Sequence, residues 1–511
     1  MNDDTSQSAP NIVVIYADDM GYGDVQCYDA RCRIPTPNLD ALAARGVRFT
    51  NAHAPDTICS PSRYGILTGR YSWRTSRKAG NPAPGEQPWI DAGRTTLPSL
   101  LKERGYDTAA FCKWGLGGDW NAAARPGREG IDVSPAGIDY SKQIPLGECV
   151  GFTYDDLNIW FSYEHYTTTY PCSREPDALE KQDGGRWYFE NGWSRGGDPD
   201  FEAFDMEEAQ MHHLENAVRY IDAKGGRAEY EPYHIRDDAP FFLYYASSIP
   251  HWPHVPAPQF QGKTGMGYYG DYVYQLDWSV GRILEALERN GMLNNKLVIF
   301  TSDNGPERQC YDYIRDYGHY SMGDWRGVKR DLWEGGHRIP FILFWPGAAG
   351  NGTVSDRFVS QTDIIGTVAD YLGYALPNGA AEDSFSFLDE LLDDHKVAHR
   401  RDLAVYHGCN NKMAIRHAEW VYVDGPTGDN EKGQGEHRTM QEPQWFRDMR
   451  GVEPHDESCE LFNLADDPQE LRNLAAELPE KAAEMKQRLT RAMEAGRTAP
   501  KRPAAKANQT G

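Results

Sequence analysis

The sequence predicts an α/β fold: a mostly parallel central sheet flanked by helices, with a smaller C-terminal α+β subdomain. Short apolar runs alternate with helical patterns, as in chains that build a parallel sheet. Polar residues follow most of these runs, and the pattern changes beyond about residue 380. A chain of 511 residues has room for one large domain and a smaller one.

Five apolar runs are typical of buried strands. They cover residues 11–21, 107–115, 240–251, 296–305 and 340–347. Four of them lead into polar clusters at their C-terminal ends, where open α/β sheets place their ligands. We therefore expect one edge of the sheet to collect Asp18, Asp19, Lys113, His251, Asp303 and Asn304.

Three helices are predicted between these strands. Apolar residues from Leu276 to Leu287 recur at 3.6-residue spacing and predict a helix that ends near Gly291. Segments 38–49 and 95–106 predict two crossover helices, each closed by a glycine.

The aromatic, glycine-rich stretch from about 150 to 215 has no clear periodicity. We interpret it as an ordered insertion over the sheet edge, whose aromatic residues either stack on a sugar or aryl substrate or pack a long loop.

The predicted division places a large domain at 1–380, the α+β subdomain at 381–498 and a disordered tail at 499–511. The subdomain contains strand-like runs within 403–425 and a terminal helix within 479–496.

Composition excludes some classes of function. The formal charge is −23, and no run of Lys and Arg forms a stripe, so we expect no nucleic-acid or membrane partner. No apolar run approaches membrane-spanning length, and the first ten residues lack the features of a signal peptide. Nine scattered cysteines without CxxC spacing favour free thiols in a reducing compartment. We expect a cytoplasmic protein, or a periplasmic or secreted one if a signal peptide was removed.

The acidic pairs supply only carboxylate and amide oxygens. Asp18 and Asp19, with Asp303 and Asn304, would suit a hard divalent cation, calcium rather than magnesium if several oxygens crowd around it. Either pair alone is equally typical of a helix cap or a turn.

Cationic residues accompany these pairs, although most lysines and arginines are simply solvated. Lys113 ends an apolar strand, where its charge needs an anionic partner, and Lys329 precedes a loop that leads into another strand. Together with Arg63, His251 and His254, they would bind a tetrahedral oxyanion such as sulfate or phosphate beside a metal.

Cys59 lies in the segment ICSPSRYGILTGR and has several interpretations. It is a buried structural thiol, a disulfide partner, a cysteine nucleophile with His251 as base, or a precursor for other chemistry. A disulfide has no obvious partner, and a soft thiolate suits an all-oxygen metal site poorly.

The segment CSPSRYGILTGR resembles the signature of the formylglycine-dependent (type I) sulfatases of the alkaline phosphatase superfamily. Four further segments agree in order and spacing: VIYADDMGYGD, FFLYYASSIPHWPHVP, VIFTSDNGP and WRGVKRDLWEGGHRIPFILFWPG. CELFNLADDPQELRNLA resembles the family's C-terminal segment. The segments around YADDMGYGD, CKWGLGGDW, GMGYYGDYVYQLDWSVG and KRDLWEGGHRIP are most similar to bacterial arylsulfatases and carbohydrate sulfatases.

The resemblance implies an alkaline-phosphatase-like fold with a catalytic domain at 1–380. It implies that a maturation enzyme, the formylglycine-generating enzyme, oxidises Cys59 to 3-oxoalanine (formylglycine). One hydroxyl of the hydrated aldehyde would attack sulfur to give a sulfo-enzyme intermediate, and the other would expel sulfate.

The resemblance also assigns roles to single residues. Arg63 would hold the formylglycine, and Lys113, His251 and Lys329 would contact the sulfate ester, with His254 as a further substrate-binding residue. One Ca²⁺ would be ligated by Asp18, Asp19, Asp303, Asn304 and the modified Cys59.

The chain departs from the family at Gly115. Where the family reads GKWHLG, this chain reads CKWGLG, so the histidine that serves as base for sulfate elimination is absent. Either His254, His319 or a water takes that role, or turnover is slow.

The function predicted from these observations is hydrolysis of sulfate monoesters, of a sulfated carbohydrate or an aryl sulfate. Two alternatives stay open. The same nucleophile would serve a phosphonate monoester or phosphodiester hydrolase, and the loss at Gly115 would suit a sulfated-glycan binder without turnover.

Overall fold

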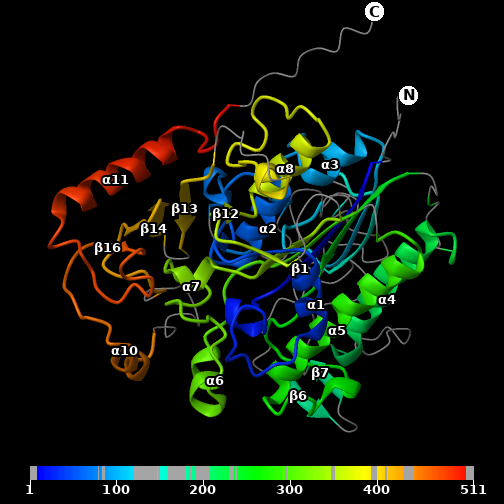
Figure 1. Ribbon diagram of the computed structural model, residues 1–511, viewed down its shortest axis with the longest axis horizontal. Coiled ribbons are helices and arrows are strands. Elements are labelled where there is room, and N and C mark those ends of the chain that lie inside the picture. The colour runs from blue at the N-terminus through cyan, green and yellow to red at the C-terminus, as the bar shows by residue number, and fades with distance from the viewer. Residues whose placement is uncertain are drawn as a thin grey trace, which may run out of the picture.

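The computed structural model describes residues 9–78, 80–82, 87–119, 147, 150–158, 179–182, 186–189, 206–229, 235, 239–293, 296–346, 352–392, 400–408, 411–430 and 442–501. Its largest element is an eight-stranded sheet with the strand order β11-β2-β10-β9-β1-β8-β4-β5. Figure 1 shows helices on both sides of this sheet. The strands are β1 (Asn11–Ala17), β2 (Val47–Phe49), β4 (Asp107–Lys113), β5 (Tyr154–Asn158), β8 (Phe241–Ala246), β9 (Lys296–Ser302), β10 (Phe341–Phe344) and β11 (Thr353–Ser355).

Most strand pairs in this sheet are parallel. β1 pairs in parallel with β8 and β9, and β4 does so with β8 and β5. β10 runs antiparallel to both β9 and β2. The predicted mostly parallel sheet is therefore confirmed, with one reversed strand inside it.

Helices cover both faces of the sheet, because alternate residues of a strand point to opposite sides. Val13 and Ile15 of β1 pack against one group of helices, and Ile12 and Val14 pack against the other. The first group is α1 (Pro37–Arg45), α4 (Met206–Lys224) and α5 (Gly267–Arg289), and the second is α2 (Cys59–Thr68), α3 (Leu97–Lys102) and α8 (Asp363–Tyr371).

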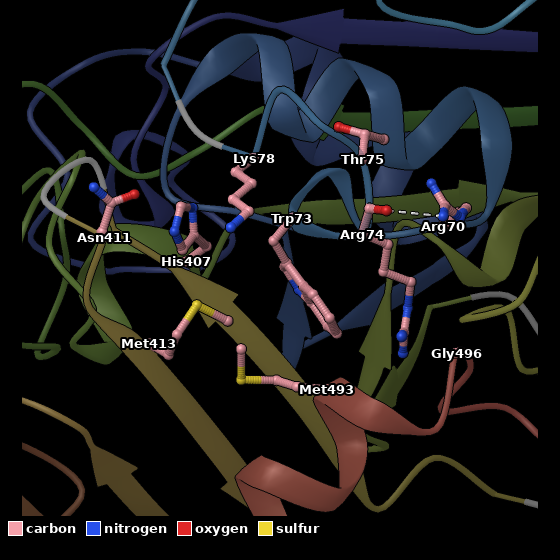
Figure 2. A pocket seen from close by; sticks show the side chains of 10 residues that line it. All are labelled: Arg70, Trp73, Arg74, Thr75, Lys78, His407, Asn411, Met413, Met493 and Gly496. Atoms are coloured by element: carbon pink, nitrogen blue, oxygen red, sulfur yellow. Dashed lines mark hydrogen bonds between the residues drawn. The ribbon is translucent and has the colours of Figure 1, made fainter.

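The C-terminal part forms its own antiparallel sheet, with the order β13-β14-β15-β16. Its strands are β13 (Leu403–His407), β14 (Met413–His417), β15 (Trp420–Val423) and β16 (Glu460–Asn463), and α11 (Pro479–Glu494) packs on it. Tyr71 and Trp73 join this core from the segment after α2. Figure 2 shows Trp73 between the two lobes, close to Met413 and Met493.

Smaller elements connect these layers. They are β3 (Ala52–His53), β12 (Val359–Ser360), β6 (Leu179–Gln182), β7 (Arg186–Phe189), α6 (Cys310–Tyr317), α7 (Glu334–His337), α9 (Leu388–Leu392) and α10 (Gln444–Arg450), with short 3₁₀ turns at Tyr22–Asp24, Ser72–Arg74 and Pro258–Phe260.

The range predicted as an irregular insertion differs from expectation at both ends. β5 is the edge strand of the main sheet, but its sequence YDDLN has no apolar run that would predict a strand. Helix α4 begins at Met206, and its buried residues Leu214, Ala217, Val218 and Ile221 have helical spacing. Much of the stretch between them lies outside the described residues.

The chain is packed at both boundaries predicted from the sequence, at residues 380 and 499. Leu391 of α9 packs in the core of the larger lobe, so that core extends past residue 380. Ala499 is buried, and its N–H donates to the carbonyl of Glu382, so the chain is packed at the start of the predicted tail. Residues 502–511 lie outside the described part.

The six cysteines of the described part are free thiols. Searching the described helices finds none with the length and hydrophobicity needed to cross a bilayer.

A buried charge network joins the two lobes. Arg416 on β14 lies 3.1 Å from the carboxylate of Glu334 on α7, and Arg338 lies 2.7 Å from the same carboxylate. Arg416 Nη1 also lies 3.0 Å from His53 Nε2. Removing one member of such a network leaves a charge buried without its partner.

We expect Arg416→Met to lower the free energy of unfolding by about 3 kcal/mol, because Glu334 loses one of its two cations. Urea denaturation of the intact chain measures this difference. Arg315→Met, at an exposed pair with Asp312, is the matched control and should change stability little. Equal effects of the two substitutions would contradict the importance of the inter-lobe network.

Candidate active site

The acidic pairs predicted from the sequence lie at adjacent strand ends. Asp18 and Asp19 follow β1, and Asp303 and Asn304 follow β9, which is hydrogen-bonded to β1 throughout. Asp303 Oδ1 accepts a hydrogen bond from the Asp19 N–H at 3.1 Å, and Asn304 Nδ2 donates to Asp19 Oδ1 at 2.8 Å. The parallel register thus joins both pairs into one acidic centre.

Helix α2 brings Cys59 and Arg63 to this centre. Cys59 is the first residue of the helix, and its Sγ lies 3.4 Å from Asp18 Oδ1 and 3.9 Å from Asp19 Oδ1. Arg63, one turn further on, lies 3.0 Å from Asp303 and 3.6 Å from Asp18. It also donates to the carbonyl of Lys113, which fixes the guanidinium between two strand ends.

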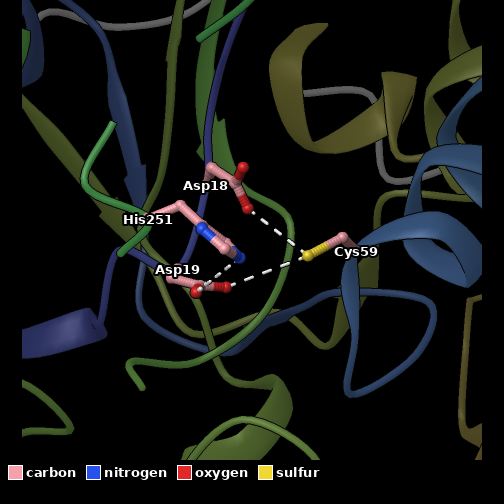
Figure 3. Close-up of side chains that lie close together, drawn as sticks. All are labelled: Asp18, Asp19, Cys59 and His251. Carbon is pink, nitrogen blue, oxygen red and sulfur yellow. Dashed lines mark hydrogen bonds and ion pairs between the residues drawn. The ribbon is translucent and has the colours of Figure 1, made fainter. Parts of the chain in front are cut away.

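Two lysines and a histidine complete the centre. Lys113 ends β4 and contacts Asp18. Lys329 Nζ lies 2.7 Å from Asp19 Oδ2, and its backbone N–H donates to the carbonyl of Pro306, close behind the Asp303–Asn304 pair. His251 Nε2 lies 3.7 Å from Asp19 Oδ2. Figure 3 shows Asp18, Asp19, Cys59 and His251 pointing toward one another.

The donor set suits a hard cation. Asp18, Asp19 and Asp303 are almost completely buried, and Asn304 Oδ1 is buried without a hydrogen-bond partner in the described part of the chain. Ligand atoms of Asp18, Asp19, Cys59 and His251 lie within 4.8 Å of one another. Carboxylate and amide oxygens of this kind are the ligands that Ca²⁺ takes in proteins.

The surroundings of Cys59 disfavour a thiolate. Burial and the neighbouring Asp303 carboxylate raise the pKa of its thiol well above the usual value. Burial, together with Lys329, lowers the pKa of His251, so this imidazole is neutral at pH 7. The environment is therefore unlike that of a cysteine nucleophile, which needs a depressed thiol pKa.

A second group of potential ligands, His53, Glu334 and His337, belongs to the inter-lobe network. Arg338 and Arg416 both bind the Glu334 carboxylate, and the two histidines share a 3.0 Å contact between their Nδ1 atoms. Because two arginines already neutralise the Glu334 carboxylate, we interpret this group as a structural network and not as a metal site.

Gly115 lies next to the Arg63 side chain, at the edge of the acidic centre. A Cβ at this position would lie 3.4 Å from Arg63 Cδ and 3.5 Å from Ser60 Oγ. Its φ of +70° is in the left-handed region, which glycine adopts without strain. The departure from the family motif is thus accompanied by a backbone that favours glycine.

The two histidines proposed as the replacement base, His319 and His254, have different surroundings in the structure. His319 uses both ring nitrogens, one with Asp24 at 2.7 Å and the other with the Arg33 N–H at 3.2 Å, and is a structural residue. The His254 ring packs on Tyr269, outside the four-residue cluster, and burial lowers its pKa to about 4 while the Asp19 charge opposes this shift.

Sequence reasoning missed two residues near the centre. Glu307 lies 3.6 Å from Lys329 and 2.8 Å from Arg330, and it is the third residue after Asn304 in the chain, which was an available signal. Asn81 Oδ1 accepts a hydrogen bond from the Ser60 N–H at 3.3 Å, and no pattern in the sequence indicated this contact.

Comparison with known proteins decides the family. Residues 10–374 match the family model described as sulfatase. The chain belongs to the sulfatase family. It is a sulfuric ester hydrolase of the type I sulfatases in the alkaline phosphatase superfamily, as the resemblance implied.

Individual relatives support this assignment. The sulfatase chain is 33% identical to the N-acetylgalactosamine-6-O-sulfatase of Bacteroides thetaiotaomicron, covering 94% of this chain and 92% of the relative. It is 34% identical to human arylsulfatase A over 72% of this chain and 65% of the relative. A solved structure from a study of glycosaminoglycan metabolism by B. thetaiotaomicron superposes with a TM-score of 0.72 at 29% identity, covering 95% of this chain and 99% of that chain.

Lys329→Met removes the ammonium group beside Asp19 and keeps the aliphatic side chain. If the centre around Cys59 cleaves the ester, a cation at this position would stabilise the negative charge that develops, so we expect kcat for an aryl sulfate to fall by about 10²–10³-fold. Steady-state kinetics measure the change, and circular dichroism verifies the fold. The matched control is Lys263→Met, at an exposed lysine. Unchanged turnover in Lys329→Met would show that Lys329 does not act in this sulfatase.

Proposed function

We propose that this sulfatase hydrolyses sulfate monoesters of a carbohydrate at the centre around Cys59. The observation that carries the proposal is the buried group of three carboxylates and three cations that surrounds Cys59. The carbohydrate substrate is supported by the relative named as an N-acetylgalactosamine-6-O-sulfatase.

The charge balance favours an anionic substrate once a divalent cation is present. Asp18, Asp19 and Asp303 balance Arg63, Lys113 and Lys329 in the protein alone. Ca²⁺ held by the three aspartates and Asn304 would make the centre net positive and would polarise the oxygens of a bound sulfate ester.

The protein's own groups divide the remaining work. Lys113 and Lys329 would bind the sulfate oxygens from two sides, because both ammonium groups already face the carboxylates of the centre. His251, neutral at pH 7, would contact the ester oxygen that leaves. Arg63 would position residue 59, since both lie on the same face of α2 one turn apart.

Residue 59 would act after a maturation enzyme has converted the thiol to formylglycine. The hydrated aldehyde would supply a nucleophilic oxygen and a second hydroxyl through which sulfate is released, which neither a thiol nor a serine offers. The buried, neutral thiol of Cys59 is consistent with a precursor.

The direct test combines mass spectrometry with substrate assays. We expect the tryptic peptide that contains residue 59 to have the mass of an aldehyde in place of the thiol. We expect the modified protein to desulfate 6-O-sulfated N-acetylgalactosamine and an aryl sulfate, and Cys59→Ala to lose at least about 10³-fold in kcat.

Other outcomes would overturn the proposal. Faster cleavage of a phosphonate monoester or phosphodiester than of any sulfate ester would replace the substrate class. Tight binding of a sulfated glycan without product release would point to a binding protein.

Calcium is expected to stabilise the folded chain. Because the aspartates would bind Ca²⁺ only in the folded state, a concentration near one hundred times Kd should add about 2.7 kcal/mol of stability, seen as a higher Tm. Chelation should reverse the shift and remove activity. Asp303→Asn should weaken the calcium response, whereas Asp222→Asn, at a surface pair with Arg289, should keep it. A Tm that does not respond to calcium would contradict the metal site.

A further inference from the structure

A pocket of about 650 Å³ lies between the segment that follows α2 and the C-terminal lobe. Its walls include Trp73, Lys78, His407, Asn411, Met413 and Met493 (Figure 2). None of these residues belongs to the centre around Cys59.

Apart from Arg70 Nε, which is ion-paired with Glu382, two buried nitrogen atoms of pocket-lining residues have no hydrogen-bond partner in the described part of the chain. They are Trp73 Nε1 and His407 Nδ1, in side chains that are 7% and 3% exposed. Buried polar groups without partners are rare in folded proteins and need an explanation. A ligand with oxygen atoms would supply the missing partners once a side-chain rotation turns these enclosed nitrogens toward the pocket.

The charge on the wall is positive. Arg70 and Arg74 line the pocket but are paired with Glu382 and Asp383, at 3.3 Å and 2.8 Å. Lys78 is exposed and forms no ion pair within the described residues. No lining residue carries a carboxylate, so an anionic group would meet Lys78 without repulsion from the wall.

The backbone at Lys78 is unusual. Its φ of +54° lies in the left-handed region, which non-glycine residues without a local side-chain hydrogen bond seldom adopt. Such strain is found preferentially at functional positions. Burial and the nearby Lys78 charge also lower the pKa of His407 to about 4, so this imidazole is neutral at pH 7.

The pocket is connected to the centre through one short segment. Arg70 follows the C-terminus of α2, whereas Asn81 binds the Ser60 N–H at the N-terminus of the same helix. The segment that contains Lys78 therefore runs back along α2 toward Cys59. Lys78 and Asn81 are three positions apart in the chain, which limits the distance between their Cα atoms to about 11 Å.

The wall also offers apolar surface. Met413 and Met493 lie side by side opposite Lys78 and His407 in Figure 2. A surface that combines apolar contacts, hydrogen-bonding nitrogens and one cation fits a sugar ring, which has C–H faces, hydroxyl groups and an anionic substituent.

We propose that this pocket is an outer subsite that binds an anionic saccharide unit of the substrate chain, next to the unit whose sulfate ester is hydrolysed. This inference rests on the proposed carbohydrate substrate. It adds that the substrate has more than one saccharide unit and that the unit next to the reacting one is anionic.

Kinetics with short and long substrates test the subsite. The probes are 6-O-sulfated N-acetylgalactosamine and a sulfated glycosaminoglycan hexasaccharide that contains this sugar. Lys78→Met should raise KM for the hexasaccharide about tenfold, because one charge-assisted contact is lost, and leave kcat and the monosaccharide KM unchanged. Met493→Trp, which fills the pocket, should act in the same direction. Lys102→Met, at an exposed lysine of α3, is the matched control.

Binding measurements separate the subsite from the reaction. Calorimetric titration of the Cys59→Ala variant with the hexasaccharide should show the same dependence on Lys78, and the desulfated hexasaccharide should bind weakly. Inorganic sulfate that binds as tightly as the hexasaccharide would overturn the saccharide assignment. Equal hexasaccharide KM and Kd for Lys78→Met and its parent would overturn the subsite.

The two proposals fail in different ways. Binding that depends on Lys78 without hydrolysis of any sulfate ester would contradict the proposed function and support the subsite. Hydrolysis of the hexasaccharide that is insensitive to both pocket substitutions would retain the proposed function and exclude the subsite. A hexasaccharide that neither binds nor reacts, beside a monosaccharide that is desulfated, would exclude the subsite and retain the proposed function.

Discussion

Pairing of buried charges is the constraint on which the rest of this structure depends. Three carboxylates are removed from water at the ends of β1 and β9, and such burial is unfavourable unless each charge meets an opposite one. The partners come from separate elements: Arg63 from α2, Lys113 from β4 and Lys329 from the loop before α7. The same contacts that stabilise the charges therefore bring these distant segments to one edge of the sheet.

Much of this arrangement could be predicted from the sequence. A parallel sheet places the residues that follow its strands on one side, so Asp18, Lys113 and Asp303 had to meet once the strands were recognised. The direction of β10 could not be predicted, because periodicity gives burial and not orientation. The edge strand β5 was missed since YDDLN has no apolar run, although it pairs with β4 along its whole length.

The details of the centre depend on contacts that local patterns do not encode. His319 looked available as a base, yet it is held by Asp24 and by the backbone of Arg33. The departure at Gly115 was visible as a changed letter, and only the structure shows that its backbone is left-handed beside Arg63. Contacts between residues far apart in the chain decide which of several similar side chains remains free for chemistry.

The link between Arg416 and Glu334 has a consequence for the engineering of this enzyme family. Glu334 is five residues after Lys329, so one arginine of the smaller lobe binds next to the loop whose lysine contacts Asp19. Chimaeras that join halves of two family members near residue 400 would separate these partners. A hybrid would therefore keep this contact only where one parent supplies the glutamate and the other the arginine at these positions.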